Sequence, residues 1–221
     1  MVEVSTSLLS VKRENIIKTI YNLETAGTNY FHIDVMDGEF VKNNTTELMN
    51  EYCGYLNTIT NIPLDVHLMV KDVESYIKNY LIYSPNIITF HYEASKDKKK
   101  MMELINYIKE NNCKVGISIK PNTNIEEIYD LLPFIHLVLI MTVEPGEGGQ
   151  KLIPETLEKI KELKAYIDKN SFEIDIEADG GINSENYEQI KSAGTNIIVS
   201  GTAIINSENY KDEIEKIKSN K

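Results

Sequence analysis

Short runs of apolar, often β-branched residues alternate along the chain with longer segments in which apolar residues recur every three or four positions. The short runs predict strands, and the longer segments predict amphipathic helices. The predicted strands are Val4–Leu9, Tyr30–Val35, Leu64–Met69, Ile87–His91, Lys114–Ile119, Leu137–Thr142, Phe172–Ala178 and Asn196–Ser200. The predicted helices are Arg13–Ala26, Val73–Tyr83, Met101–Asn111, Pro154–Lys169 and Asn183–Ala193.

Residues at the ends of several segments support these boundaries. Asp72 precedes Val73, and an aspartate at this place commonly accepts hydrogen bonds from the first amides of a helix. Gly27 and Gly194 directly follow two of the predicted helices, where glycine commonly ends a helix.

The strict alternation of strands and helices predicts a parallel sheet with right-handed crossovers. No linker or low-complexity tract interrupts the series of strand–helix units. About eight such units in one compact chain fit a closed barrel better than an open sheet. We therefore predict an α/β fold, a single-domain (β/α)₈ TIM barrel that covers residues 1–221.

Composition and charge narrow the classes of partner. The hydrophobic fraction of 42% and the charged fraction of 26% are ordinary for a globular protein. The net charge of −11 argues against nucleic acid as the main partner, although a local pocket for a small phosphate remains compatible with it. Cys53 and Cys113 match no metal or redox spacing and predict free thiols. With no signal-peptide pattern and no apolar stretch of membrane-spanning length, we expect a cytoplasmic protein without a membrane partner.

Two of the predicted strands carry unusual side chains on one face. Alternate residues of a strand point the same way, so each of these strands presents an acid, a histidine and a methionine together. The two sets are His32, Asp34 and Met36, and Asp65, His67 and Met69. Such side chains make a poor core, and the two strands suggest one shared site.

In a (β/α)₈ barrel, catalytic groups lie at the carboxyl ends of the strands. Imidazoles and carboxylates together suit Zn²⁺, Fe²⁺ or Mn²⁺ and do not decide between these ions. The candidate ligands at the predicted rim are His32, Asp34, His67 and Asp179. His91, at the end of the fourth strand, either contacts a substrate or buttresses the site. His136 is interpreted as structural or exposed.

Glycine-rich loops follow the last three predicted strands, at Glu144–Gln150, Asp179–Asn183 and Ser200–Ala203. Glycine lets backbone amides approach a phosphate closely, and the N-terminus of a following helix favours negative charge. Barrels commonly hold a substrate phosphate in the loops after strands seven and eight. The three loops therefore predict a phosphate site.

Methionines end three of the predicted strands. They either fill gaps in the core or form an apolar, polarisable surface over a flat intermediate. These residues are Met36, Met69 and Met141.

The chain resembles the ribulose-phosphate 3-epimerase family over nearly its whole length. The motifs that carry the resemblance are Ser7–Leu9, His32–Val41, Leu64–Met69, Phe90–Ala94, Met141–Gly146, Gly148–Gln150 and Asp179–Ile182. It implies a barrel of the ribulose-phosphate-binding type, a divalent metal cofactor, a small ketose phosphate as substrate, and a homo-oligomer.

The resemblance also implies roles for individual residues. His32, Asp34, His67 and Asp179 would bind the metal, and Asp34 and Asp179 would also be the acid–base pair. Met36, Met69 and Met141 would form the hydrophobic cap. The substrate-binding residues would be Ser7, His67, Gly146, Gly148, Gly149, Gln150, Asp179, Gly180, Gly181, Ser200 and Gly201.

The implied reaction is the 3-epimerisation of D-ribulose 5-phosphate to D-xylulose 5-phosphate through an enediolate, with one aspartate acting on each face of C3. An alternative in the same class is epimerisation of a hexulose phosphate such as D-allulose 6-phosphate. A metal-independent lyase on a related barrel is less favoured, because such enzymes carry Asp-x-Lys on the third strand where this chain reads Asp65-Val66-His67. A non-catalytic sugar-phosphate sensor would not need two opposed aspartates.

Four positions depart from the family pattern. Thr6 and Lys42 replace prolines, Lys120 replaces an asparagine, and Glu147 replaces an aromatic residue in the loop after the sixth strand. None of these changes removes a proposed ligand or a catalytic aspartate, but they leave the identity of the sugar open. Lys42 is a candidate ion-pair partner for Glu147.

Overall fold

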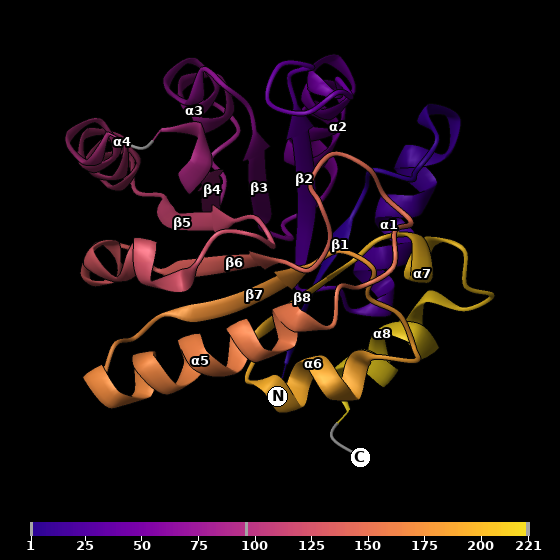
Figure 1. Ribbon diagram of the computed structural model, residues 1–221. Coiled ribbons are helices and arrows are strands. Elements are labelled where there is room, and N and C mark those ends of the chain that lie inside the picture. The colour runs from indigo at the N-terminus through magenta and orange to yellow at the C-terminus, as the bar shows by residue number, and fades with distance from the viewer. Residues whose placement is uncertain (1, 96, 220–221) are drawn as a thin grey trace.

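A computed structural model describes residues 2–95 and 97–219. Its parallel strands pair in sequence order, and the last pairs with the first to close a barrel. The strands form an inner ring and the helices lie outside it (Figure 1). The fold is the predicted single-domain (β/α)₈ barrel. The strands are β1 (Glu3–Ser7), β2 (Tyr30–Met36), β3 (Leu64–Met69), β4 (Ile87–His91), β5 (Lys114–Ile119), β6 (Leu137–Met141), β7 (Asp175–Asp179) and β8 (Ile197–Ser200).

The helices around the barrel differ widely in length. The α-helices are α1 (Ile16–Ala26), α2 (Thr46–Ile59), α3 (Val73–Leu81), α4 (Lys98–Glu110), α5 (Glu155–Asn170), α6 (Tyr187–Ala193), α7 (Thr202–Ile205) and α8 (Tyr210–Lys218). The 3₁₀ segments are η1 (Arg13–Asn15), η2 (Tyr92–Ala94) and η3 (Ile125–Phe134). Within the described ranges, none of these helices combines the length and apolar character that crossing a membrane requires.

Alternation along the strands separates the core from the barrel interior. In β2, Phe31, Ile33 and Val35 are buried in the large apolar cluster that joins strands and helices. His32 and Asp34 are buried as well, but they lie outside that cluster and contact polar side chains of neighbouring strands. The apolar side chains of β2 therefore pack against the helices, and its polar side chains line the interior of the barrel.

Strand register brings the two polar strands into contact at the level of the site. β2 and β3 pair in parallel, with Asp34 opposite His67 and Met36 opposite Met69. On the other side of the barrel, β7 pairs with β8 so that Asp179 lies opposite Val199. Because the barrel is closed, Asp179 and Asp34 face the same interior.

The predicted helix ends are largely correct. Asp72 accepts a hydrogen bond from the Ser75 amide at the start of α3. Gly27 and Gly194 end α1 and α6. Both cysteines are free and buried, as the sequence predicts.

The helix α2 was absent from the predicted elements. Its buried stripe consists of Met49, Tyr52, Cys53 and Leu56, which follow helical spacing. Gly54 and several polar residues lie within this segment and weaken the apolar pattern. Tertiary packing against the barrel, rather than local propensity, explains this helix.

Two strand boundaries differ from the prediction by more than one residue. β1 ends at Ser7 instead of Leu9, and β7 begins at Asp175 instead of Phe172. The Phe172 amide donates to the Ile167 carbonyl, so Phe172 belongs to the turn that ends α5. An apolar residue before a strand need not be part of it.

Candidate active site

Four side chains converge inside the barrel at the carboxyl ends of their strands. They are His32 and Asp34 from β2, His67 from β3 and Asp179 from β7. Asp34 Oδ1 lies 3.4 Å from both His32 Nε2 and His67 Nδ1. Asp179 Oδ2 lies 3.9 Å from His32 Nε2 and 3.8 Å from His67 Nδ1. The sequence-predicted ligand set is therefore assembled in one place.

This cluster fits a divalent metal ion. His32 Nε2 and His67 Nδ1 are buried and have no hydrogen-bond partner among the described residues. Tetrahedral Zn²⁺ ligands about 2.0–2.1 Å from the ion would lie roughly 3.3 Å from one another, close to the observed spacing. Two nitrogens and two carboxylates that face each other without hydrogen bonds are the donor set that a cation completes.

A second polar layer lies beneath the cluster. Asp65 Oδ2 lies 2.6 Å from His32 Nδ1 and accepts a hydrogen bond from Ser5 Oγ at 2.7 Å. Glu177 is fully buried beside this pair, and burial together with the charge of Asp65 raises its pKa well above the ordinary value. The 2.6 Å contact is a hydrogen bond and leaves no room for an ion between these two atoms. Asp65 instead fixes the ring of His32 so that Nε2 faces the upper cluster.

The two aspartates of the upper cluster differ in their electrostatics. Burial raises the pKa of Asp34, but His32 and His67 lower it more, so that it lies below the ordinary value. Burial and the nearby charge of Asp34 raise the pKa of Asp179 to about 6. Burial lowers the pKa of His32, while Asp65 and Asp34 raise it above the ordinary value. The site therefore separates the protonation of its two carboxyl groups.

The methionines gather over the aspartates. Met36, Met69 and Met141 line a small cavity of about 40 Å³ together with Asp34 and Asp179. The loop after β6 covers this cavity, with residues 144–147 in its wall. Its volume suits about one water molecule, so the loop leaves little space over the acid pair on this side.

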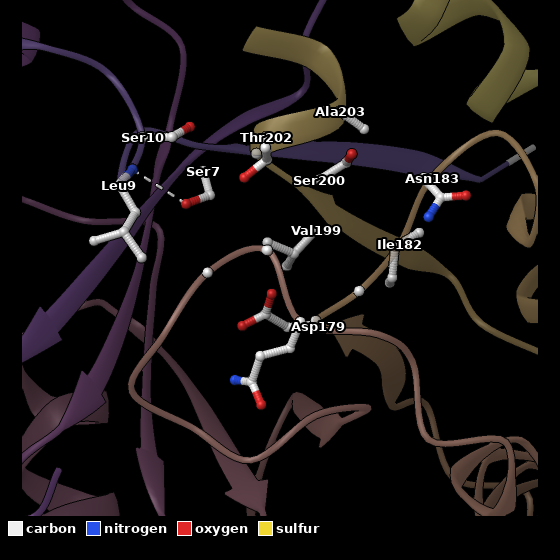
Figure 2. Close-up of a pocket in the computed structure, with 16 residues that line it drawn as sticks. Ser7, Leu9, Ser10, Asp179, Ile182, Asn183, Val199, Ser200, Thr202 and Ala203 are labelled. Carbon is white, nitrogen blue, oxygen red and sulfur yellow. Dashed lines mark hydrogen bonds between the residues drawn. The ribbon is translucent and has the colours of Figure 1, made fainter. Parts of the chain in front are cut away.

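A larger cavity of about 600 Å³ adjoins the acid pair on the side of β7 and β8. Figure 2 shows Ser7 and Leu9 at one side of this cavity and Ile182 and Asn183 at the other. Most of the predicted substrate-binding residues line it: Ser7, Gly148, Gly149, Gln150, Asp179, Gly180, Gly181, Ser200 and Gly201. Its described lining contains no Lys or Arg, so an anion there would have to be held by backbone amides and hydroxyl groups.

The remaining predicted residues have other positions. His67 lies in the four-residue cluster, and Gly146 lies in the loop that covers the acid pair. The helix after Gly181 begins only at Tyr187, later than the predicted Asn183. On the β7 side the cavity is therefore lined by loop residues, whereas Thr202 and Ala203 at the start of α7 line it on the β8 side.

Sequence reasoning missed the contact that holds the covering loop. Asn43 Nδ2 donates to the Gly146 carbonyl at 2.7 Å, which joins the loop after β2 to the loop after β6. Gln150 Nε2 donates to the carbonyls of Glu144 and Glu147 and braces the same loop from inside. Only its position shortly after the motif His32–Val41 marks Asn43 in the sequence as a candidate.

Comparison with known proteins decides the family. The family model described as "Ribulose-phosphate 3 epimerase family" matches residues 3–205. The ribulose-phosphate 3-epimerase of Escherichia coli (strain K12) is 35% identical over 98% of this chain and 94% of its own length. That of Bacillus subtilis (strain 168) is 37% identical over the full length of both chains. The chain belongs to the ribulose-phosphate 3-epimerase family. It is therefore an enzyme of the isomerase class.

Solved structures outside the ribulose-phosphate 3-epimerase family share the architecture. A 3-hexulose-6-phosphate synthase superposes with a TM-score of 0.71 at 10% identity and covers 98% of both chains. A 3-keto-L-gulonate-6-phosphate decarboxylase from Vibrio cholerae superposes with a TM-score of 0.71 at 11% identity, over 98% of this chain and 95% of its own. At this identity, the likeness shows the fold alone.

Three of the four departures from the family pattern lie together beside the covering loop. Lys42, Lys120 and Glu147 line a surface cavity of about 290 Å³ beside the covering loop. Lys120 Nζ lies 4.2 Å from the centre of the Phe40 ring, a cation–π contact. Among the ion pairs of the described residues, none joins Lys42 to Glu147, so the expected pairing is not formed. Lys42 and Glu147 share a cavity instead.

Proposed function

We propose that this chain is a metal-dependent 3-epimerase that interconverts D-ribulose 5-phosphate and D-xylulose 5-phosphate by two-base proton transfer at C3. Membership of the family supports the reaction class. The single structural observation that carries the proposal is the convergence of Asp34 and Asp179 beside both a histidine pair and a glycine-lined cavity.

The position of Asp179 supports the binding mode. Asp179 lines both the glycine-rich cavity and the small cavity under the methionines. A ketose phosphate with its phosphate near Gly149, Gly181 and Gly201 would therefore extend its carbon chain toward the aspartates. The methionines would then pack over the planar intermediate and exclude water from it.

Two carboxyl groups explain inversion at one carbon. One aspartate removes the C3 proton from one face, and the other returns a proton to the opposite face. A single base would tend to return its proton to the side from which it came. The reaction therefore requires one aspartate to be ionised while the other carries a proton. Ser7 donates to Asp34 Oδ2 at 2.7 Å and would hold this base in place.

His32, Asp34, His67 and Asp179 would hold the metal. A divalent cation held there would supply Lewis-acid stabilisation of the negative charge that develops on the C2 oxygen when the C3 proton leaves, worth several kcal/mol. The donor set leaves Zn²⁺, Fe²⁺ and Mn²⁺ as candidates.

The test combines an epimerase assay with metal analysis of the purified protein. Chelation should abolish turnover of D-ribulose 5-phosphate, and one ion should restore it. D-Allulose 6-phosphate, assayed in parallel, distinguishes the hexulose-phosphate alternative. Full activity after exhaustive chelation would contradict metal dependence, and a large preference for the hexulose phosphate would contradict the proposed substrate.

We further propose that residues 1–221 form one catalytic domain and that the chain assembles as a homo-oligomer. The family match over residues 3–205 supports the extent of the domain. Sedimentation of the purified protein measures its subunit number, and a monomer at all concentrations would contradict the second point.

A further inference from the structure

A chain of hydrogen bonds runs from the cluster into the wall of the barrel on the side of β4 and β5. His67 Nε2 lies 2.9 Å from His91 Nε2, and His91 Nδ1 lies 3.2 Å from Glu93 Oε2. The other Glu93 oxygen accepts from the Lys120 amide at 2.8 Å and from the Thr123 hydroxyl. Both histidine side chains are fully buried.

The direction of the protons along this chain follows from the charge at its end. Glu93 is a carboxylate and can only accept, so the facing atom His91 Nδ1 carries a proton. When Nδ1 carries the single proton of the His91 ring, that ring is neutral. The neutral ring therefore has a bare Nε2, which accepts the proton of His67 Nε2. With its proton on Nε2, the His67 ring presents Nδ1 as a bare nitrogen.

The bare nitrogen is the one that faces the proposed metal site. His67 Nδ1 has no hydrogen-bond partner among the described residues and lies 3.4 Å from Asp34 Oδ1. In the opposite order, His91 Nδ1 would turn a lone pair toward the Glu93 carboxylate, and His67 Nδ1 would carry a proton into the cluster. That order is both repulsive at Glu93 and unable to bind a cation.

We propose that Glu93 and His91 are positioning residues that fix the proton of His67 on Nε2 and so keep Nδ1 free for a divalent cation. This inference rests on the proposed metal-dependent function. The two histidine ligands would then present different nitrogens, Nδ1 from His67 and Nε2 from His32. Asp65 would fix His32 directly, and Glu93 would fix His67 through His91. Removing the hydrogen-bond acceptor behind a histidine ligand typically weakens metal binding about 10–100-fold.

The substitution Glu93→Gln tests the order of the protons. The two donors at Glu93 Oε1 would keep the carbonyl oxygen of the amide in that place, so its NH₂ group would face His91 Nδ1. That NH₂ group needs an acceptor, which would reverse the chain and place a proton on His67 Nδ1. Thr123→Val is the matched control, because it removes a hydrogen bond from the same carboxylate without reversing the order.

Two measurements decide the proposal. Nitrogen-15 NMR of histidine-labelled, metal-free wild-type protein should show His67 protonated at Nε2 and His91 at Nδ1. Competition with a chromophoric chelator should show that E93Q binds Zn²⁺ about 10–100-fold more weakly than wild type, while T123V keeps wild-type affinity. If near-ultraviolet circular dichroism shows that E93Q does not fold, His91→Phe takes its place in the test. This substitution removes the acceptor for the His67 Nε2 proton and should weaken Zn²⁺ binding.

Protonation of wild-type His67 at Nδ1 would overturn the proposed role of Glu93 and His91, as would unchanged Zn²⁺ affinity in folded E93Q. A wild-type protein that binds no Zn²⁺ or Mn²⁺ would instead contradict the proposed metal dependence. The tautomer of His67 is measured without metal, so the two failures are distinguishable.

Discussion

Ser7 Oγ donates to Asp34 Oδ2 at 2.7 Å, while the other oxygen of the same carboxylate faces the two histidines. Asp34 is therefore held at one oxygen and offers the second to the cluster. Because Ser7 ends β1 and Asp34 lies in β2, the pairing of two neighbouring strands fixes the orientation of the proposed base.

Removing the Ser7 hydroxyl should lower catalytic efficiency more than it lowers the stability of the fold. A hydrogen bond to a charged group contributes about 1.5–3 kcal/mol, so Ser7→Ala should lower kcat/KM about 10- to 100-fold. Steady-state kinetics measure the loss, and thermal melting reports the fold. Ser207→Ala removes a hydroxyl bonded to the Ile204 carbonyl outside the site and should leave kcat/KM unchanged. Equal effects of the two substitutions would contradict the role of Ser7.

The contact between Asn43 and Gly146 should control closure of the loop over the aspartates. Asn43→Ala removes the only hydrogen bond between these loops among the described residues and should raise KM several-fold, with faster proteolysis within residues 144–150. Asn170→Ala removes a similar bond, to the Tyr166 carbonyl on α5, and is the control. Proteolysis of the loop at the wild-type rate in the Asn43 variant would show that the bond does not hold it.

The backbone at Gly181 should be sensitive to a single added carbon. Its φ is +67°, and a Cβ there would lie 2.4 Å from the Leu152 amide nitrogen. Gly181→Ala should therefore displace the wall of the glycine-rich cavity and raise KM for the sugar phosphate about 10-fold or more. Gly54→Ala lies in α2 with open space around its Cβ and should stabilise the fold by about 0.5–1 kcal/mol. Unchanged KM in the Gly181 variant would remove the cavity from the substrate site.

Ionised Glu93 should make the fold sensitive to acid. Burial raises the pKa of Glu93, but hydrogen bonds from His91, Thr123 and the Lys120 amide lower it to about 2. Because the folded-state pKa is depressed, this stabilisation is present above about pH 4.5 and is lost as the pH falls toward 2. It amounts to at most about 3 kcal/mol, of which ~1 kcal/mol is lost by pH 3.5.

Urea unfolding at pH 6 and at pH 3.5 measures this effect. The free energy of unfolding should fall less between these values in Glu93→Gln than in wild type. Parallel losses in the two proteins would show that Glu93 is not stabilised in its ionised form.

The sequence predicts much of the fold because the alternation of apolar and polar positions is strong in the strands. It also predicts that His32, Asp34, His67 and Asp179 lie together, since all four lie on strands of one barrel. Helix α2 was missed because Gly54 and polar residues weaken its pattern. The role of His91 was left open because a contact between two imidazoles depends on strand register and ring orientation. Asn43 lies in a loop, where spacing predicts no partner.

The most direct test of the proposed acid–base pair, Asp34 and Asp179, is exchange of the C3 hydrogen with solvent. Proton NMR in D₂O monitors this exchange. Asp34→Asn and Asp179→Asn each keep an oxygen in the cluster but remove one acid–base group. Each variant should interconvert the epimers at least 10²–10⁴-fold more slowly than wild type. Each should still exchange the C3 hydrogen of one epimer, a different one in each variant. Interconversion at the wild-type rate in either variant, or exchange of the same epimer in both, would contradict the two-base account.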